Sequence, residues 1–441
     1  MKQKEFFHSV TLDRDKCMGC INCIKRCPTE AIRVRNGKAK IISERCIDCG
    51  ECIRVCPHHA KKAIFDPLSV IDQYEYTIAL PAPSFYGQFN NLDDVDIVLS
   101  ALIDLGFDAV FEVSKAAELV SDATRKILHQ PDCPKPLISS ACPAVTRLIR
   151  VRFPSLIDNI LDLNAPVEVA ARLAKQEAME KTGLPAEKIG AVFISPCPAK
   201  VTAAKMPLGT QKSEISAVLA VSEVYPKLLK YMDHTNHREG LSDSGKMGVA
   251  WASSAGESSA LLNDNYLAAD GIENVIRVLE DLEDEKFSNL DFIELNACNG
   301  GCVGGVLNVE NPYIARTKLK RLRKYLPVSL NHLSQIPDQM KWDEPLEFTP
   351  VMELDADFHV ALNKMNEMEH IEASLPGLDC GSCGAPSCKA LAEDVVRGFA
   401  SVDDCIFKFR ENVASFVDNI HKLEFPFPQS YREKQDDPEK K

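Results

Sequence analysis

The sequence has no apolar run that approaches the ~18 to 20 residues needed to cross a bilayer. The apolar part of its N-terminus, around Phe6 and Phe7, is too short for a signal peptide. Positive charge is also scarce, since 51 Lys and Arg against 64 Asp and Glu give a net charge of −13. Nucleic-acid binding normally requires a basic surface, which this balance argues against. We therefore expect a cytoplasmic protein with no membrane span and no nucleic-acid partner.

Cysteine, in contrast, is abundant, with 17 in a chain of 441 residues. A chain of this length is typical of about two to four domains. Thiols in the cytoplasm are kept reduced by glutathione and thioredoxin, so these cysteines do not indicate a disulfide framework. Clustered cysteine spacings in that compartment indicate metal binding instead.

Eight of the cysteines form a repeat near the N-terminus. Cys17-x2-Cys20-x2-Cys23-x3-Cys27-Pro28 recurs as Cys46-x2-Cys49-x2-Cys52-x3-Cys56-Pro57. This is the spacing of bacterial two-cluster ferredoxins, in which the fourth cysteine of each run binds the other run's cluster. The spacing predicts one [4Fe-4S] cluster on Cys17, Cys20, Cys23 and Cys56, and another on Cys46, Cys49, Cys52 and Cys27. Zinc is the alternative metal for four cysteines, but two matching runs that end in Cys-Pro favour iron–sulfur clusters.

The middle of the chain alternates between short apolar runs and amphipathic stretches. Strands are expected at 76–80, 108–113, 137–140, 190–194, 247–251 and 290–295. Helices are expected at 93–105, 116–129, 144–152, 167–181, 222–231 and 274–282. Such alternation predicts parallel α/β sheets.

Four further cysteines lie in loops that follow three of these expected strands: Cys142, Cys197, Cys298 and Cys302. Open α/β sheets bind ligands at the carboxyl ends of their strands. We therefore expect the four thiols to converge on one site. The alternative is that they are buried structural thiols, because free cysteine packs as a small hydrophobe.

A Pro-rich stretch at 326–350 precedes a third region, which begins with an expected helix at 355–373. Cys380-x2-Cys383-x4-Cys388 and the later Cys405 provide another four thiols, and only Cys133 is then unassigned. We expect domains at 1–75, 76–345 and 346–425, followed by a disordered tail at 426–441 that is charged and poor in apolar residues. The basic stretch 316–325 is either a solvated helix face or a docking patch for an acidic electron-transfer partner.

The loops around the four central cysteines resemble those of the [FeFe] hydrogenases. Ser139-Ser140-Ala141-Cys142-Pro143 resembles that family's Thr-Ser-Cys-Cys-Pro, Pro196-Cys197-Pro198-Ala199-Lys200 resembles Pro-Cys-x-x-Lys, and Cys298-Asn299-Gly300-Gly301-Cys302 resembles Cys-x-Gly-Gly-Cys. Ala82-Pro83-Ser84 is similar to a segment that lines the active site. The resemblance implies an α/β H-cluster domain of parallel sheets with helices, an N-terminal α+β two-cluster ferredoxin domain and a small, mainly helical C-terminal iron–sulfur domain. This domain order resembles the sensory or regulatory branch of the family.

The resemblance also implies the cofactors. Cys142, Cys197, Cys298 and Cys302 would hold the H-cluster, a [4Fe-4S] cubane joined through Cys302 to a diiron site with CO, cyanide and dithiolate ligands. Two ferredoxin-type [4Fe-4S] clusters and one C-terminal [4Fe-4S] cluster, on Cys380, Cys383, Cys388 and Cys405, complete the set. Lys200 would donate a charge-assisted hydrogen bond to a cyanide, and Pro83 and Ser84 would line the site. Gly300 and Gly301 would let the backbone approach the cofactor closely.

Three residues depart from the family pattern. Ala141 replaces the cysteine that relays protons in turnover members, Ser195 replaces a methionine, and Ala203 replaces a glutamate. A methyl group neither donates nor accepts a proton, and general acid–base help is worth roughly 10²–10⁴-fold, so slow turnover is expected. Ser195 adds a hydrogen-bonding group near the diiron site. The segment before Cys142 offers Glu118 and Asp122 as candidate relay carboxylates.

We therefore expect a protein that binds H2 and slowly interconverts it with protons and electrons, as a sensor or regulator of the hydrogenase family. Its expected partners are a ferredoxin or another redox or signalling protein, the hydrogenase maturation proteins, and a second copy in a homodimer. Two alternatives stay open. One is a catalytic ferredoxin-linked hydrogenase with another proton route, and the other is a non-enzymatic iron–sulfur scaffold or electron carrier without a diiron site. Lys200 and Ala82-Pro83-Ser84 favour the diiron site.

Overall fold

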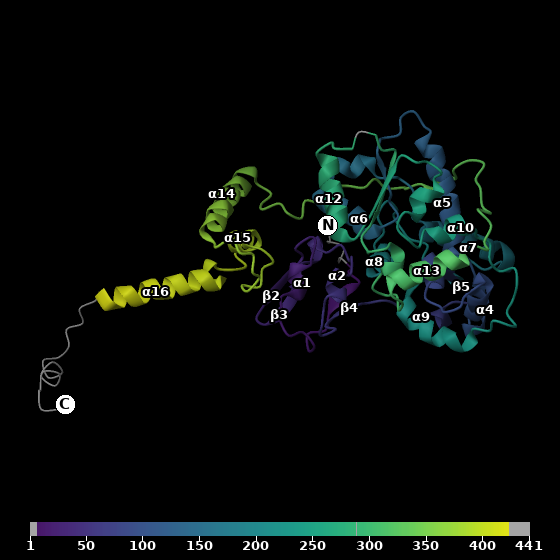
Figure 1. The fold of residues 1–441 in the computed structure, drawn as a ribbon, viewed down its shortest axis with the longest axis horizontal. Helices are drawn as coiled ribbons and strands as arrows, with labels where there is room; N and C mark the ends of the chain where they lie inside the picture. Colours follow the sequence, from purple (N-terminus) through teal and green to yellow (C-terminus); the bar gives the residue numbers. More distant parts are fainter. Residues whose placement is uncertain (1–6, 288, 423–441) are drawn as a thin grey trace, which may run out of the picture. The chain divides into compact units, whose positions relative to one another are not determined.

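A computed structural model of the chain describes residues 7–287 and 289–422 (Figure 1). The fold divides into two units, Met1–Met352 and Glu353–Lys441. Within the described ranges, no helix is both long and apolar enough to cross a membrane. The tail expected to be disordered, 426–441, lies outside the described residues.

Two small antiparallel strand pairs frame the N-terminal cysteine runs. β1 (Val10–Leu12) pairs with β4 (Lys61–Ala63), and β2 (Ile32–Arg35) pairs with β3 (Lys38–Ile41). The short helices α1 (Asn22–Lys25) and α2 (Glu51–Arg54) each carry the third cysteine of a run. Cysteine side chains share the core with a few apolar residues, among them Ile24 and Ile32. Because this apolar core is small, bound metal clusters would supply much of its folding free energy.

Parallel strands build the rest of the first unit, in two sheets. The larger sheet has the order β6–β5–β8–β9, from β5 (Tyr76–Pro81), β6 (Ala109–Val110), β8 (Ile189–Ser195) and β9 (Ala217–Ala220). The smaller sheet has the order β10–β11–β7, from β7 (Leu137–Ile138), β10 (Tyr266–Asp270) and β11 (Phe292–Asn296). The expected parallel α/β class is confirmed, although β9 and β10 were not expected from the sequence.

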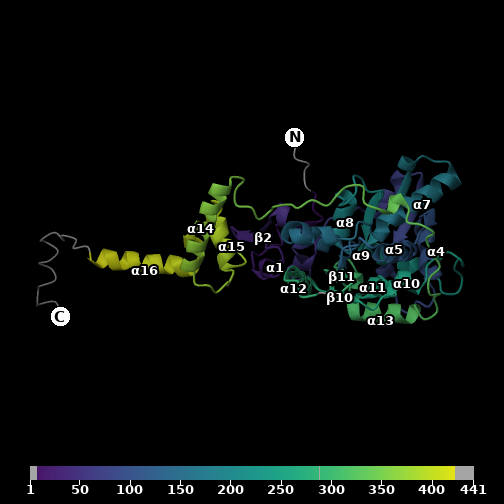
Figure 2. The ribbon, with the colours of Figure 1, turned by 90° about the horizontal axis from the view of Figure 1, so that it is seen from above.

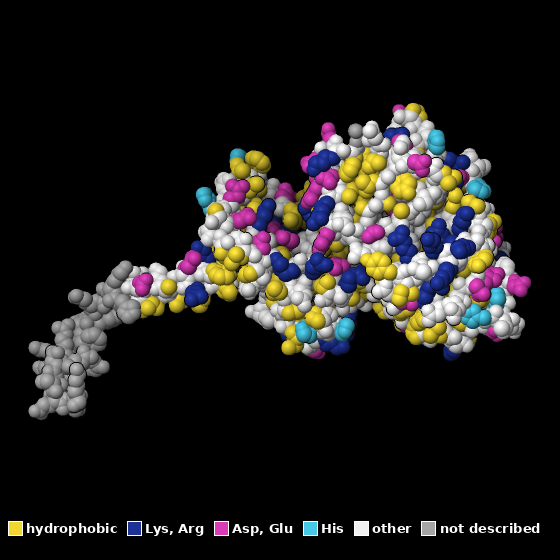
Figure 3. Space-filling view, viewed as in Figure 1, with side chains coloured by type: hydrophobic (Ala, Val, Ile, Leu, Met, Phe, Trp, Pro, Cys, Tyr) yellow, Lys and Arg dark blue, Asp and Glu magenta, His cyan; other side chains and the backbone are white. Residues whose placement is uncertain are grey.

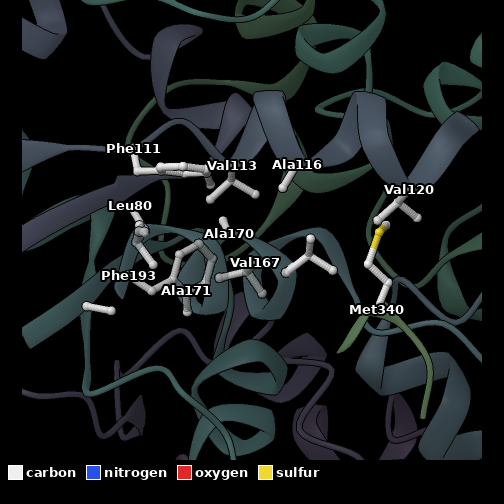
Figure 4. Packing of buried hydrophobic residues seen from close by; sticks show 14 of the residues in the cluster. Leu80, Phe111, Val113, Ala116, Val120, Val167, Ala170, Ala171, Phe193 and Met340 are labelled. Carbon is white, nitrogen blue, oxygen red and sulfur yellow. The ribbon is translucent and has the colours of Figure 1, made fainter. Parts of the chain in front are cut away.

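Helices cover both faces of the larger sheet, because successive residues of its strands point to opposite sides. Phe193 of β8 faces a cluster with α5 (Val113–Leu128) and α7 (Pro166–Thr182), shown in Figure 4. Val192 faces a second cluster with α4 (Val95–Leu105), α9 (Val221–Leu228) and α13 (Pro312–Leu322). α6 (Pro143–Arg152) and α12 (Ile272–Glu283) pack against the smaller sheet.

The expected strand at 247–251 is wrong, because α10 spans Lys246–Ala250 as a helix. A short apolar run is equally suited to a buried strand and a buried helix, and five residues are too few for the period to decide. α10 lies so close to α5 that a Cβ on Gly248 would stand 2.0 Å from the carbonyl oxygen of Ser114. Gly248 therefore permits a direct contact between two helix backbones.

Gly248→Ala should destabilise the first unit by about 1–3 kcal/mol, because an overpacked contact with backbone is not relieved by rotating a side chain. The measurement is the midpoint of thermal unfolding, which should fall. Lys246→Ala, at an exposed position of the same helix, is the control and should change stability by less than about 0.5 kcal/mol. Equal midpoints for the two variants would contradict the close approach of α10 to α5.

The second unit is mainly helical over its described residues, as expected. α14 (Phe358–Ser374) packs against α15 (Cys388–Val396), and α16 (Ile406–Lys422) follows the 3-10 turn Val402–Asp404. Its buried apolar cluster contains Leu375, Leu391 and the thiol of Cys405. A core of this size rarely suffices alone, so a metal cluster is a natural additional source of stability.

Candidate metal centres and active-site cavity

The two N-terminal cysteine runs enclose two separate pockets. Cys17, Cys20, Cys23 and Cys56 line one pocket, and we call them the outer thiol set. Cys27, Cys46, Cys49 and Cys52 line the other pocket, and we call them the inner thiol set. The fourth cysteine of each run therefore lies among the first three of the other, in the crossed arrangement that the spacing indicates. Backbone N–H groups donate to the crossing sulfurs, from Ala31 to Cys27 Sγ at 3.2 Å and from Ala60 to Cys56 Sγ at 3.3 Å.

The inner set adjoins the α/β region. A Cβ on Gly50 would lie 2.7 Å from Val306 Cγ2, and Cys49 packs in the same apolar cluster as Cys142 and Cys197. Figure 2 shows the ferredoxin-like elements beside α12 and α8 (Pro198–Lys205). Burial raises the pKa of Cys46 and Cys49, and it raises the pKa of Cys52 to about 12. Metal binding requires thiolates, so a bound cluster would displace these protons.

The four central thiols come together from both sheets. Cys142 follows β7 and immediately precedes α6, and Cys197 follows β8 and immediately precedes α8. Cys298 follows β11, and Cys302 begins the 3-10 turn Cys302–Gly304. All four act electrostatically on Lys200, which places them around one point. Convergence at the carboxyl ends of three strands was expected from the sequence, whereas the division between two sheets was not.

Glycine brings the last of these loops against its neighbours. Gly300 and Gly301 both have positive φ, of 82° and 87°. A Cβ on Gly301 would lie 2.5 Å from the backbone nitrogen of Ser254, and one on Gly305 would lie 2.2 Å from the carbonyl oxygen of Pro196. The loop that carries Cys298 and Cys302 thus reaches the Cys197 loop because it lacks side chains there.

Lys200 supplies the positive charge at the centre of the four thiols. Burial would lower the pKa of Lys200, but the charges of Cys302, Cys197, Cys142 and Cys298 outweigh it, so the pKa of Lys200 is raised. Burial raises the pKa of Cys197 to about 11, against the attraction of Lys200. The Lys200 ammonium donates to Cys302 Sγ at 3.6 Å. An anionic metal group held by these thiols would therefore find its counter-charge already in place.

A cavity lies beside Cys302 and Lys200. Of the four central thiols, Cys302 is the one that lines it, together with Pro83 and Ala141. Ser84 is fully buried next to Pro83, and its hydroxyl has no hydrogen-bond partner among the described residues. A thiol and a cation on the cavity wall, with an unpaired hydroxyl buried next to Pro83, fit a polar metal group attached through Cys302.

The other departures from the family pattern have clear places in the structure. The Ser195 hydroxyl donates to the Cys197 carbonyl at 3.0 Å and accepts from the Cys197 N–H at 3.3 Å, so it shapes the loop before α8. Ala203 lines a second cavity, which is also lined by Lys200. The position of the family's glutamate is therefore open space in this chain.

The candidate relay carboxylates on α5 do not line the cavity. Glu118 accepts from the backbone nitrogens of Gly245 at 2.8 Å and Leu330 at 2.9 Å, and Asp122 pairs with Arg125 at 2.7 Å. The residues that α5 contributes to the cavity wall are Val113 and Ala117. The positions of Glu118 and Asp122 indicate structural roles, in which they fix neighbouring loops and side chains.

Two carboxylates that sequence reasoning missed do line the cavity, Glu257 and Glu294. Glu257 lies in α11 (Gly256–Ala260) and accepts from the Ser139 hydroxyl at 2.7 Å. Glu294 lies within β11 and accepts four hydrogen bonds of 2.8–3.0 Å, two of them from Ser258. One signal was available, because a glutamate inside the apolar run Phe292-Ile293-Glu294-Leu295 is unusual in a buried strand.

Glu257 and Glu294 are coupled by their charges. Burial raises the pKa of Glu257 well above its usual range, and the charge of Glu294 raises it further. Burial also raises the pKa of Glu294, against the hydrogen bonds that it accepts. Each of two neighbouring buried charges opposes the ionisation of the other. The four hydrogen bonds that Glu294 accepts favour its charged form, whereas burial and the charge of Glu294 favour the protonated form of Glu257.

The remaining four thiols, Cys380, Cys383, Cys388 and Cys405, line one pocket of the second unit. The Cys388 N–H, at the start of α15, donates to Asp379 Oδ1 at 2.6 Å. This contact closes the loop around the pocket, which suits a single cluster bound by four cysteines.

The basic stretch 316–325 lies on and just after α13. Figure 3 shows Lys and Arg side chains gathered on the surface over this part of the first unit. Lys318 pairs with Glu310 at 2.5 Å, whereas Arg316, Lys320, Arg321 and Lys324 are exposed. A solvated face and a docking patch both fit this placement, so the docking patch stays a prediction.

Family comparisons agree with this architecture. The family "Iron only hydrogenase large subunit, C-terminal domain" matches residues 75–262 and 252–306, a 4Fe-4S dicluster domain matches 9–57, and an Fe-S cluster domain matches 375–407. The fold and the thiol sets thus define an iron–sulfur redox protein with a parallel α/β core. The chain belongs to the [FeFe]-hydrogenase family, as its loops indicate.

Two curated relatives illustrate the similarity. Iron hydrogenase 1 of Clostridium pasteurianum is 24% identical over 389 residues, which cover 71% of this chain and 68% of the relative. The periplasmic [Fe] hydrogenase large subunit of Nitratidesulfovibrio vulgaris is 28% identical over 213 residues, which cover 44% of this chain and 50% of the relative. A solved [FeFe] hydrogenase of Chlamydomonas reinhardtii overlaps 63% of this chain at 15% identity, with a TM-score of 0.47.

Proposed function

We propose that the chain holds a diiron group beside a cubane at its central thiols and slowly interconverts H2 with protons and electrons, as a sensor or regulator. The observation that carries this proposal is the cavity beside Cys302, where Lys200 provides a cation and position 141 provides a methyl group. The cation favours the cofactor, and the methyl group removes the proton donor of turnover members. When bound, the diiron group supplies the redox chemistry that acts on H2.

In this proposal each thiol set holds one [4Fe-4S] cluster. Cys142, Cys197, Cys298 and Cys302 would hold the central cubane, and Cys302, which also lines the cavity, would hold the diiron group as well. The order of the pockets supports an electron path from the central thiols through the inner set to the outer set, because Cys49 of the inner set packs beside Cys142 and Cys197. A ferredoxin or signalling partner would then exchange electrons at the outer set.

Glu257 is the residue that exchanges protons with the cavity in this proposal. The Ala141 N–H donates to Ser139 Oγ at 3.2 Å, and the Ser139 hydroxyl donates to Glu257. These contacts fix Glu257 at the wall that Ala141 leaves open. Glu294 stands next to Glu257 as the group that takes the proton onward. A route from this wall, without a side-chain donor at position 141, fits slow turnover.

Infrared spectroscopy of the matured protein tests the proposal. Bands from bound CO and cyanide are expected, and their absence in protein that contains its iron–sulfur clusters would favour the scaffold. If the bands are present, H2 turnover as fast as that of a catalytic hydrogenase would contradict the sensor role and favour the ferredoxin-linked enzyme.

Ala141→Cys should raise the rate of H2 turnover by roughly 10-fold or more, because it restores a proton donor at the cavity wall. Ala141→Ser is the matched control and should gain much less, since a hydroxyl gives up its proton far less readily than a thiol. Rates are compared at equal diiron content, measured from the infrared bands. An unchanged rate in Ala141→Cys would mean that proton transfer at this position does not limit turnover.

A further inference from the structure

The outer and inner thiol sets carry buried charges of opposite sign. Lys61, at the start of β4, lines the outer pocket and is 3% exposed. Asp48, two residues after Cys46, lines the inner pocket and is 1% exposed. Among the described residues that line these two pockets, no other Lys, Arg, Asp or Glu is present. Two cysteine sets with the same spacing therefore differ in the sign of the charged residue that lines their pocket.

Lys61 is a buried cation whose ammonium has no hydrogen-bond partner within the described part of the chain. Burial raises the pKa of Cys23, and the charge of Lys61 opposes that rise. Lys61 acts in the same sense on Cys56 of the outer set and on Cys27 and Cys52 of the inner set. A buried ammonium without a nearby anion is strongly unfavourable. The negative charge that compensates Lys61 is therefore that of the thiolates and of the cluster that they hold.

Asp48 is held in place by both parts of the first unit. Its Oδ1 accepts from the Val10 N–H at 3.0 Å, and its Oδ2 accepts from the Thr202 hydroxyl of α8 and from His8 Nδ1, both at 2.9 Å. Its Oδ1 is also 3.8 Å from Cys46 Sγ. Ligand atoms of His8, Cys46 and Asp48 lie within 4.8 Å of one another, but Cys46 already belongs to the inner set, so we infer no separate metal site.

We propose that Lys61 and Asp48 give the outer cluster a higher reduction potential than the inner cluster. Reduction of a cluster adds one electron and hence one negative charge, which a nearby cation stabilises and a nearby carboxylate opposes. Arg147 acts on both Asp48 and Cys46 and offsets part of the carboxylate's charge, so the asymmetry comes from both residues together. This inference rests on the proposed cluster binding.

The consequence is a direction for electron flow. An electron that leaves the central site reaches the inner cluster first and is then stabilised on the outer cluster, beside Lys61. The transfer from the inner to the outer cluster is therefore the downhill step for an electron on its way to a partner.

A redox titration followed by electron paramagnetic resonance tests the inference on the full chain, produced without the diiron group so that turnover plays no part. Lys61→Met should lower the reduction potential of the outer cluster by about 59 mV. For one electron this is a roughly 10-fold fall in the ratio of reduced to oxidised cluster at a given solution potential. Lys61→Arg should keep most of the wild-type potential. Asp48→Asn should raise the potential of the inner cluster. The central and C-terminal clusters should not shift and serve as references.

Matched controls are adjacent in the same domain. Lys62 pairs with Asp13 at 2.8 Å near the surface, so Lys62→Met and Asp13→Asn should leave both potentials unchanged. Wild-type potentials in both Lys61→Met and Asp48→Asn, at full iron content, would overturn the inference and leave the cluster assignment intact. A wild-type chain without iron at the outer and inner sets would instead overturn the cluster assignment. If Lys61→Met does not assemble its clusters, the reduction potential of the inner cluster in Asp48→Asn decides whether the inference holds.

Discussion

Glu257→Gln should lower H2 turnover by roughly 100-fold or more, because an amide does not exchange a proton as a carboxylic acid does. Glutamine keeps an acceptor for the Ser139 hydroxyl, which lies 2.7 Å from Glu257 Oε2, so the local packing should persist. Turnover is measured at equal intensity of the CO and cyanide bands, which should be unchanged in the variant.

The matched control is Glu112→Gln. Glu112 is also a buried glutamate, and burial raises its pKa, but it accepts from Tyr86 and Ser244 and does not line the cavity. Its substitution should leave turnover near the wild-type value in protein that folds. A Glu257→Gln variant that turns over H2 at the wild-type rate would show that the proton reaches the cavity by another path.

The pH dependence of stability tests the burial of Glu257 independently of turnover. Burial raises the pKa of Glu257 in the folded chain, so folding takes up a proton between the two pKa values. The stability linked to Glu257 is fully present below its unfolded pKa of about 4.3 and is lost as pH rises through the folded pKa. Glutamine does not ionise. As pH rises into the alkaline range, the midpoint of thermal unfolding should therefore fall less in Glu257→Gln than in wild type, although the variant loses activity.

The gathering of the thiols into sets could be predicted from the sequence because its signals are local. Cysteine spacing encodes the crossed pairing of Cys27 and Cys56, since three thiols of one short loop reach only one pocket. Cys142, Cys197 and Cys298 each follow an expected strand, so the sequence also predicted that they lie at the carboxyl edges of parallel sheets. These inferences needed only short stretches of chain and a general rule about where parallel sheets bind ligands.

The carboxyl groups of Glu257 and Glu294 at the cavity could not be predicted in this way, because contacts between residues far apart in the sequence place them there. Ser139 and Glu257 are 118 residues apart in the chain yet share a hydrogen bond, and no local spacing indicates that contact. Asp48 and Thr202 are 154 residues apart and present the same difficulty. The prediction of a strand at 247–251 was wrong for a different, local reason. The helix Lys246–Ala250 has only five residues, and their pattern is too short to exclude a strand.

Lys200→Met should abolish the CO and cyanide bands of the matured protein. Lys200 Nζ lies 3.6 Å from Cys302 Sγ and acts on all four central thiols. Removing one partner of a buried charge pair typically weakens the structure by about 3–5 kcal/mol. Applied to cofactor binding, that loss is roughly a hundred- to several-thousand-fold in affinity. Turnover should fall in proportion, and iron held by the outer and inner sets should be unaffected.

Lys205→Met is the matched control, since Lys205 ends the same helix and pairs with Asp66 at 2.8 Å nearer the surface. It should retain both the infrared bands and turnover. Retention of the bands in Lys200→Met would mean that the thiols hold the group without this cation, and Lys200 would then be only a packing residue. Loss of the bands together with intact N-terminal clusters would place the defect at the cavity itself, because α8 and its contacts with the ferredoxin-like region would still be formed.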